Sequence, residues 1–256
     1  MSATIFNPSF PGKEVVPTLS AVAEWKRRAA RGAVELAEGK EVVGLGSGTT
    51  VAEMVKMLGE RRPRSVFIPA SRSTESLCKE VGLRLGTLEE YGGVDLTIDG
   101  ADEVDPELDL LKGGGGAHTR EKLLALVSRE VVIAVDKTKL VRVLGEKRPV
   151  PVEVLPFGWK QTAKRLERLG GKASLREEKG RPFLTDNGNY VLDVRFGPIK
   201  RPRELEKRIN SVPGVVENGI FSGLADVVVV GHEEGCTVLC RGKRLGKSLE
   251  DWLSKL

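Results

Sequence analysis

Short runs of β-branched and apolar residues alternate with segments of helical periodicity along the first part of the chain. The apolar runs lie at 42–45, 65–68, 94–98 and 131–135. The helical patterns cover 20–37, 50–59, 74–81 and 119–128. Because the runs are apolar on both faces, they are typical of parallel strands covered by helices on both sides. With right-handed connections, this alternation predicts a Rossmann-like α/β sheet.

The pattern changes near residue 150, where strands and helices follow one another in a different order. Strands are expected at 150–154, 173–176, 190–196 and 215–221, and helices at 159–169 and 203–211. This βαββαβ order is that of a ferredoxin-like unit. The segment 186–189, Asp-Asn-Gly-Asn, is typical of the central hairpin turn of such a unit.

The apolar run 225–230 has the composition of another fully buried strand. It most simply returns to the first sheet, which makes the smaller unit an insertion. We therefore expect a Rossmann-like domain formed by residues 1–149 and 225–256. Residues 150–224 are expected to form an inserted ferredoxin-like α+β domain.

The composition excludes several classes of protein. The 256 residues are 40% hydrophobic and 30% charged, which is typical of a globular protein with a sizeable core. No apolar run approaches the roughly 20 residues of a membrane-spanning helix, and the N-terminal residues lack the pattern of a secretion signal. Cys78, Cys236 and Cys240 are too few for a disulfide framework, as in a reducing compartment. We expect a cytoplasmic protein that does not bind a membrane.

Metal ions and nucleic acid are two alternative partners. His232, Cys236 and Cys240 recur every four residues, but a fourth ligand is missing and the segment is strand-like, which favours buried cysteines over zinc. The net charge of +5 includes short basic clusters at 61–64 and 241–244. Only 5% of residues are aromatic and no known nucleic-acid motif occurs, so these clusters indicate solvated surface. A mildly positive protein also attracts small phosphorylated anions.

Polar loops follow the expected strands at the edge of the sheet where ligands of open α/β folds bind. The first loop contains Ser47, Gly48, Thr49 and Thr50 and leads into a helix whose free N–H groups can hold a phosphate. The third glycine of the dinucleotide fingerprint is absent, and the hydroxyl groups favour a monophosphate. A tight strand-to-helix turn without a ligand remains the alternative.

The loop after the third strand is acidic and contains Asp99, Gly100, Ala101 and Asp102. Asp99 comes directly after an apolar run, so we expect it at the sheet edge, partly desolvated. There it could bind a sugar hydroxyl or move a proton. A solvated turn and a magnesium site are the alternatives, although no histidine is near and the spacing matches no EF-hand loop.

Four consecutive glycines follow Lys112 and precede a helical pattern. A backbone without Cβ atoms can approach a ligand closely and turn its N–H groups toward it. Glu121 falls in the first turn of the following helix and should point toward the same crevice, where Lys112 could compensate negative charge on a substrate oxygen. His118 is a second candidate acid or base. The alternatives are that Glu121 is an ordinary solvent-facing residue of the helix and that His118 is a local hydrogen-bond partner.

Taken together, these motifs resemble those of type A ribose-5-phosphate isomerases. In chain order they are Gly-Leu-Gly-Ser-Gly-Thr-Thr (44–50), Asp-Gly-Ala-Asp-Glu (99–103), Lys-Gly-Gly-Gly-Gly-Ala-His-Thr-Arg-Glu-Lys (112–122) and Thr-Asp-Asn-Gly-Asn (185–189). The resemblance spans residues 20–232 and includes shorter matches at 71–75, 151–154, 213–216 and 219–221. The sequence departs from the usual pattern in the fourth glycine, in His118 and in an extension at 233–256.

The resemblance implies interconversion of ribose 5-phosphate and ribulose 5-phosphate through an enediolate, without a metal or organic cofactor. It implies that Glu121 is the general base and that Asp99 is the acid or base of ring opening. Asp102 and Lys112 would handle protons and charge at the first two oxygens. The residues implied to bind substrate are Ser47, Gly48, Thr49, Thr50, Gly100, Ala101, Gly113, Gly114, Gly115, Lys139 and Lys26.

The expected partner is a small sugar phosphate, and the expected assembly is a homodimer or homotetramer. The alternative function is a non-catalytic sugar-phosphate sensor of the same fold. A sensor needs affinity but no base. The joint presence of Glu121, Asp99, Asp102 and Lys112 therefore favours an enzyme.

Overall fold

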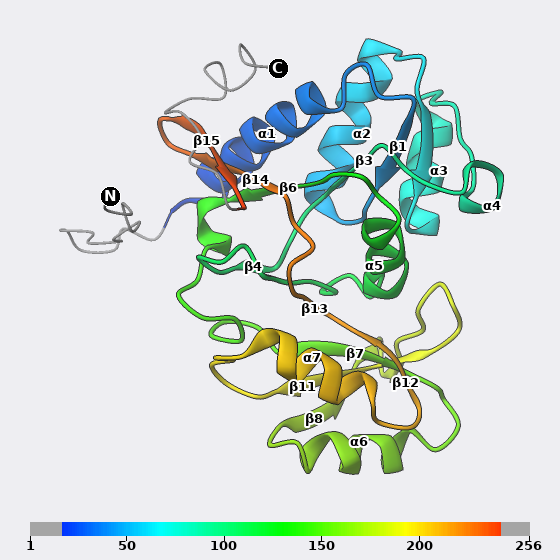
Figure 1. Cartoon of the computed structure of the whole chain (residues 1–256), viewed down its shortest axis with the longest axis vertical. Helices are drawn as coiled ribbons and strands as arrows, with labels where there is room; N and C mark the ends of the chain where they lie inside the picture. Colours follow the sequence, from blue (N-terminus) through cyan, green and yellow to red (C-terminus); the bar gives the residue numbers. More distant parts are fainter. Residues whose placement is uncertain (1–16, 242–256) are drawn as a thin grey trace.

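The larger of the two main sheets is parallel except at one edge (Figure 1). The computed structural model describes residues 17–241. The strands of this sheet are β1 (Val42–Leu45), β2 (Val66–Pro69), β3 (Leu96–Asp99), β6 (Val131–Asp136), β14 (Val227–His232) and β15 (Gly235–Cys240). Their order is β15-β14-β6-β3-β1-β2, and only β15 runs antiparallel to its neighbour. The predicted Rossmann-like α/β class is confirmed.

Alternate side chains of these strands face two different layers. The helices of this part are α1 (Leu19–Leu36), α2 (Thr49–Arg61), α3 (Arg72–Glu80), α4 (Leu88–Tyr91) and α5 (His118–Leu126). Val132 and Ala134 of β6 lie in the core beneath α1, α2 and α3. Val131, Ile133 and Val135 of the same strand face the opposite layer. That layer contains α5 and a three-stranded sheet of β4 (Glu103–Val104), β5 (Leu110–Leu111) and β13 (Ile220–Phe221).

The second main sheet is antiparallel and has the strand order β12-β7-β11-β8. Its elements are β7 (Val150–Val154), α6 (Trp159–Glu167), β8 (Lys172–Leu175), β11 (Tyr190–Arg195), α7 (Pro202–Asn210) and β12 (Val215–Asn218). Val152 and Val154 of β7 pack with Leu166 of α6 and Ile209 of α7 in one apolar core. Since side chains alternate along a strand, Glu153 between the two valines faces away from these helices. The connectivity is that of the expected ferredoxin-like unit.

The strand expected at 215–221 is interrupted at Gly219, and its two halves belong to different sheets. The N–H of Gly219 donates to Pro151 O (2.8 Å), and its carbonyl oxygen accepts from the N–H of Lys112 (2.8 Å). A Cβ at Gly219 would lie 2.2 Å from Lys112 O. Only glycine fits this close backbone approach. We propose the same domain division as above, with boundaries at 149/150 and 224/225. β13 lies within the residues of the inserted domain, but it pairs with β5, which lies outside them.

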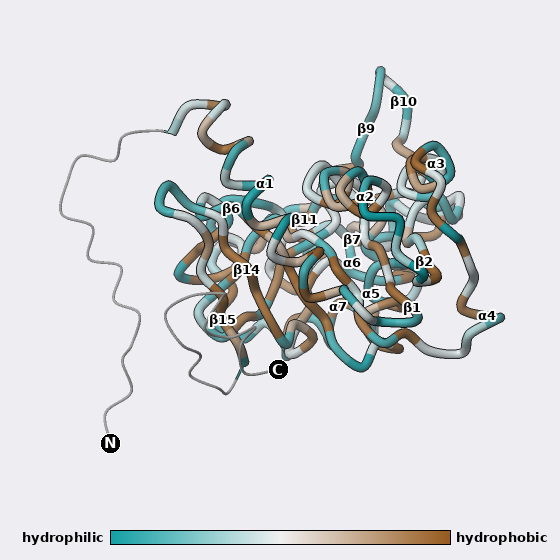
Figure 2. Tube along the Cα trace, turned by 90° about the horizontal axis from the view of Figure 1, so that it is seen from above, coloured by the Kyte–Doolittle hydropathy of each residue, from teal (hydrophilic) through white to brown (hydrophobic). Residues whose placement is uncertain are grey.

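The connection between β8 and β11 is longer than expected. It forms a small hairpin of β9 (Glu177–Glu178) and β10 (Arg181–Pro182), which projects as a hydrophilic arm (Figure 2). The turn of this hairpin lies at Lys179 and Gly180, both with positive φ. The turn predicted at 186–189 is present in the connection between the paired strands β8 and β11. It is closed by the N–H of Thr185 donating to Asn189 O (2.9 Å) and flanked by an antiparallel bridge between Leu184 and Tyr190. The turn at Lys179 and Gly180, which precedes it, was not predicted.

None of the helices within residues 17–241 is long and apolar enough to span a membrane.

Candidate active site

Two helices that begin at the carboxyl edge of the large sheet have no side-chain cap. The N-cap residue of α2 is Gly48, with φ 104°, and that of α5 is Ala117. In contrast, Thr18 and Ser71 cap α1 and α3 with their side chains. The uncapped N-terminus of α2 leaves backbone N–H groups available to an anion. This end of the helix follows β1 and contains the expected phosphate loop.

Ser47 and Thr49 of this loop contact side chains of three neighbouring segments of the large domain. The N–H of Ser47 approaches Asp99 Oδ1 (3.3 Å), and its hydroxyl lies 2.9 Å from Ser71 Oγ. Lys26 of α1 donates from Nζ to Thr49 Oγ1 (3.4 Å), so the structure brings this cation to the loop as the resemblance implied. Ser71 had no predicted role, although it belongs to a matched motif.

Lys112 lies at the centre of a buried charge cluster. Its Nζ is 2.9 Å from Asp99 Oδ2 and 3.2 Å from Glu121 Oε2, and it donates to Gly100 O (2.6 Å). Asp99, Lys112 and Glu121 are each at most 4% exposed. Within residues 17–241, Oε2 of Glu121 accepts no hydrogen bond of good geometry despite its proximity to Lys112. Glu121 Oε2 is thus a buried carboxylate oxygen with the Lys112 ammonium as its neighbour.

Burial shifts the pKa of these groups in ways that suit proton transfer. It raises the pKa of Glu121 to about 8, aided by the nearby charge of Asp99 and opposed by Lys112. Burial also raises the pKa of Asp99, again opposed by Lys112. Burial disfavours the Lys112 ammonium, but the carboxylates of Asp99 and Glu121 outweigh it and raise the pKa of Lys112. Lys112 therefore stays charged, while Glu121 can exchange a proton near neutral pH.

The glycine segment lies against Asp102 and His118. The N–H of Gly114 donates to Asp102 Oδ2 (2.8 Å), and Gly113 and Gly116 have positive φ values of 99° and 77°. A Cβ at Gly113 would lie 2.8 Å from His118 Nδ1, so a side chain at that position would collide with the imidazole. Burial lowers the pKa of His118 to about 4, which keeps the ring neutral near pH 7. His118 thus supports the loop as a neutral group.

The remaining predicted residues lie around this centre. Gly100 is close to Thr50, since a Cβ at Gly100 would be 3.8 Å from Thr50 Cβ. Ala101 packs against the core beside β6. Gly115 is exposed, and Lys139 ends a 3₁₀ turn (Lys137–Lys139) directly after β6. Among residues 17–241, no hydrogen bond or ion pair joins the Lys139 side chain to the charge cluster.

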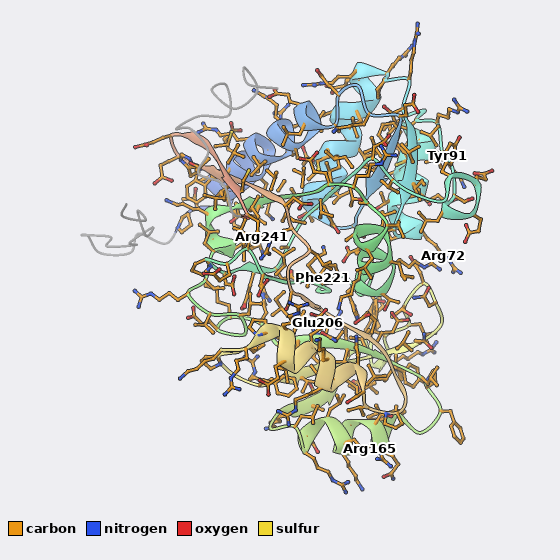
Figure 3. All side chains as sticks on the ribbon, viewed as in Figure 1. Arg72, Tyr91, Arg165, Glu206, Phe221 and Arg241 are labelled. Carbon is orange, nitrogen blue, oxygen red and sulfur yellow. The ribbon has the colours of Figure 1, made fainter. Side chains whose placement is uncertain are left out.

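Sequence reasoning missed a second group of buried charges next to the site. Lys122, the residue after Glu121, donates from Nζ to Glu206 (2.7 Å) and Glu217 (2.8 Å) of the smaller unit. Its ammonium lies 4.9 Å from the centre of the Phe221 ring, which also lies 5.5 Å from Lys112 Nζ. Figure 3 shows Phe221 between the two main sheets, above Glu206. The sequence around Lys122 contains charges of both signs within a helical pattern, and this pattern does not indicate the ion pairs of Lys122.

Glu153 of β7 connects the smaller unit to α5. Its carboxylate accepts a hydrogen bond from Thr119 of α5. It also accepts hydrogen bonds from three side chains of the matched motif 185–189, namely Thr185, Asn187 and Asn189. Burial would raise the pKa of Glu153, but these hydrogen bonds outweigh it and hold the pKa below the usual value. Glu153 is therefore an ionised, fully satisfied group, which is typical of a structural carboxylate.

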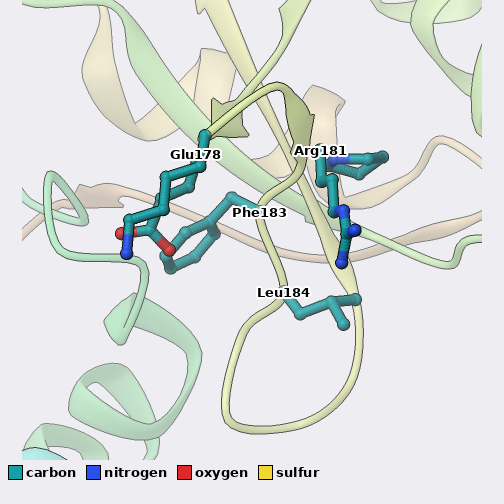
Figure 4. A pocket seen from close by; sticks show the side chains of 6 residues that line it. Glu178, Arg181, Phe183 and Leu184 are labelled. Carbon is teal, nitrogen blue, oxygen red and sulfur yellow. The ribbon is translucent and has the colours of Figure 1, made fainter.

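A pocket lies on the hairpin arm (Figure 4). Its lining residues are Glu178, Lys179, Arg181, Pro182, Phe183 and Leu184. None of the predicted site residues contributes to it, and all but Phe183 are exposed. It lacks the buried convergent polar groups of a small-molecule site.

The described residues contain no group of three or more histidine, cysteine or acidic side chains arranged to hold a metal ion. His232, Cys236 and Cys240 lie on the β14–β15 hairpin, where His232 Nε2 is 3.0 Å from Thr237 Oγ1.

The chain is similar to one well-defined group of proteins. The family model described as ribose 5-phosphate isomerase A (phosphoriboisomerase A) matches residues 66–235. A protein of Gloeobacter violaceus named ribose-5-phosphate isomerase A is 55% identical over 84% of this chain and 95% of its own length. One of the same name from Thermococcus kodakarensis is 42% identical over 84% and 96%.

Solved structures give the same result. A D-ribose-5-phosphate isomerase in complex with phospho-erythronic acid superposes with a TM-score of 0.84 at 40% identity, over 86% of this chain and 99% of that one. The isomerase of Methanocaldococcus jannaschii superposes with a TM-score of 0.81 at 43% identity, over 85% and 99%.

Proposed function

The chain belongs to the ribose 5-phosphate isomerase A family, and we propose that Asp99, Lys112 and Glu121 form its catalytic centre. It is an aldose–ketose isomerase that interconverts ribose 5-phosphate and ribulose 5-phosphate, a reaction of the pentose phosphate pathway. One observation carries the assignment of the centre. A buried lysine lies within 3.2 Å of two buried carboxylates, at the loop edge of the large sheet.

Glu121 is proposed as the base that moves a proton between carbons 1 and 2 of the open sugar. Its Oε2 has no other well-oriented hydrogen-bond partner among residues 17–241, and its pKa of about 8 lies close to the working pH of a proton shuttle. Removing this proton makes the neighbouring oxygen negative. The permanently charged Lys112 is suited to stabilise that oxygen in a site from which water is excluded.

Asp99 is proposed to assist ring opening, and Asp102 to exchange protons with the first hydroxyl groups. Asp99 Oδ1 accepts from the N–H of Gly100 (2.7 Å), and its other oxygen binds Lys112. Asp102 is only partly buried and holds the glycine segment through Gly114. Both carboxylates are therefore fixed in direction before substrate arrives.

The phosphate of the substrate is proposed to bind at the N-terminus of α2, where Ser47, Gly48, Thr49 and Thr50 offer N–H and hydroxyl donors. Lys26 adds a cation, since its Nζ already lies beside Thr49. Lys139, after β6, is proposed as the second cation. Gly100, Ala101 and the glycines 113–115 would contact the sugar through their backbones, which lack bulky side chains.

No cofactor is required by this chemistry, because both the base and the electrophilic group are side chains of the protein. For the assembly we propose a homodimer or homotetramer, and for the location the cytoplasm, as expected for this class of enzyme.

An isomerase assay in the presence of a chelator tests the proposed centre. The wild-type chain should convert ribose 5-phosphate, and Glu121→Gln should lower kcat at least about 100-fold while inorganic phosphate still inhibits by competition. Glu89→Gln, an exposed carboxylate at the start of α4, is the matched control and should keep full activity. Full turnover by Glu121→Gln would remove Glu121 from the role of base. Loss of wild-type activity with chelator, restored by magnesium, would contradict the metal-free mechanism.

A further inference from the structure

Arg176 reaches the glycine segment from the smaller unit. It follows β8 directly, and its guanidinium forms a two-pronged ion pair with Asp193 of β11, with Nε 2.9 Å from Oδ2. The remaining nitrogen, Nη1, donates to the carbonyl oxygens of Gly113 (2.9 Å) and Gly114 (3.1 Å). The side chain is 16% exposed. A single cation thus binds two consecutive peptide groups of the candidate active site, and the Gly113 carbonyl also accepts from the N–H of Gly116 (3.0 Å).

The guanidinium is held in place by its surroundings. Its carbon lies 5.7 Å from the centre of the Phe183 ring, a distance at which a cation is attracted to an aromatic face. The same ring covers Gly116, because a Cβ there would lie 2.4 Å from Phe183 Cε1. Asp193 and Phe183 therefore fix Arg176 on one side of the loop, opposite to Asp102.

The direction of the carbonyl groups determines the direction of the N–H groups. The described chain has no cis peptide bonds, and in a trans peptide the N–H points away from the C=O. The carbonyl of Gly113 points at Arg176, and the N–H of Gly114 accordingly points away, to Asp102 Oδ2. The carbonyl of Gly114 also points at Arg176, so the N–H of Gly115 points away from it as well.

The N–H of Gly115 has no acceptor among residues 17–241, and Gly115 is exposed. An exposed N–H that is fixed in direction and has no partner among the described residues is suited to receive an oxygen atom of a ligand. Because the adjacent carbonyl binds a guanidinium, this peptide group is polarised and its N–H is a stronger donor.

We propose that Arg176 is a positioning residue of the isomerase: it orients and polarises the glycine segment so that the N–H of Gly115 binds a substrate oxygen that gains negative charge. This inference rests on the proposed function of the Asp99, Lys112 and Glu121 centre. Arg176 does not touch the substrate. It acts through two peptide groups, those that follow Gly113 and Gly114.

Removal of the guanidinium should lower turnover more than affinity. In Arg176→Ala, kcat should fall about 10- to 100-fold, less than the roughly 100- to 1,000-fold loss seen when a donor to a developing oxyanion is removed, because the N–H of Gly115 itself remains. KM and inhibition by inorganic phosphate should change less than about threefold, because the phosphate loop is untouched. Guanidinium chloride at non-denaturing concentration should restore part of kcat, and sodium chloride at equal ionic strength should not. Arg176→Lys should be intermediate, since lysine keeps the charge but lacks the fork.

The matched control is Arg181→Ala on the exposed arm shown in Figure 4, which should keep wild-type kcat. If Arg176→Ala does not fold, Arg176→Lys and Asp193→Asn replace it in the test, and each should lower kcat at constant KM. A wild-type kcat in Arg176→Ala, a rise in KM alone, or an equal loss in Arg181→Ala would overturn the role of Arg176. A wild-type chain that binds but does not isomerise ribose 5-phosphate would refute the proposed function and this inference together.

Discussion

Replacement of Glu121 by glutamine should have opposite effects on activity and on stability. The carboxyl group is 4% exposed, and burial together with the charge of Asp99 raises its pKa to about 8, from 4.5 for a free glutamate. Glutamine keeps the shape of the side chain but cannot ionise. The variant therefore loses the base and also loses the cost of a buried charge.

The sign of the stability effect follows from proton counting. Between pH 4.5 and about 8 the folded state retains the Glu121 proton and the unfolded state has lost it. The unfolded state thus binds fewer protons, and the free energy of unfolding of the wild type falls as pH rises through this window. At about 1.4 kcal/mol per pH unit, the full loss amounts to at most about 5 kcal/mol. Since Glu121 shares its titration with Asp99 and Lys112, we expect about 2 to 3 kcal/mol.

Urea titrations of both proteins at pH 5.5, 7 and 9 measure this difference. Glu121→Gln should be close to the wild type at pH 5.5 and more stable at pH 9, by an amount that grows across the window. The wild-type kcat/KM should rise with pH and level off near pH 8, because only the ionised carboxylate removes a proton. Glu89→Gln, whose carboxylate is exposed, should show neither effect.

A stability difference that does not change with pH would refute the reasoning, because it would mean that Glu121 is ionised in the folded state throughout. A kcat/KM profile that is flat from pH 5.5 upward would lead to the same conclusion.

Three further substitutions test other contacts of the structure. Lys26→Met should raise KM about tenfold at constant kcat, as expected for a cation that binds only the phosphate. The control Lys56→Met, on the outer side of α2, should leave both constants unchanged. Steady-state kinetics measures both variants, and a fall in kcat alone in Lys26→Met would contradict the assignment. Gly219→Ala should destabilise the protein by about 2 kcal/mol or more, because the new methyl group would collide with Lys112 O; an unchanged midpoint in urea would mean that the backbones separate easily. Lys122→Met should lower the free energy of unfolding by about 3 kcal/mol, because it leaves two carboxylates without their cation. A variant as stable as the wild type in the urea titration would show that solvent compensates these carboxylates.

The parallel sheet and the core of the site could be predicted because both depend on local patterns. A strand of apolar residues followed by an acidic residue places Asp99 at the sheet edge, and a glutamate one turn into the next helix places Glu121 beside it. Lys112 follows from its position before the glycines. These relations need only strand periodicity, helix periodicity and the rule that ligands bind at the carboxyl ends of parallel strands.

Contacts between distant segments could not be predicted from these patterns. Arg176 and Gly113 are 63 residues apart, and Arg176 stands in a charged stretch that resembles a solvated turn. The break of the strand at Gly219 depends on the approach of the Lys112 backbone, which no local pattern contains. The ion pairs of Lys122 likewise require the positions of two other elements. In each case the partner is fixed only by the way the smaller unit lies on the larger one.

The backbone passes from β12 to β13 through Gly219, and this crossing limits how the enzyme can open. Its ladder bonds run to Pro151 on one side and to Lys112 on the other, within a single residue. A rigid-body separation of the Pro151 and Lys112 segments would have to break at least one of these bonds, and it would pull on the lysine of the charge cluster if the Lys112 bond held. We therefore expect sugar phosphates to enter and leave through local movements of the surrounding loops, with the two halves of the molecule keeping one mutual orientation throughout turnover.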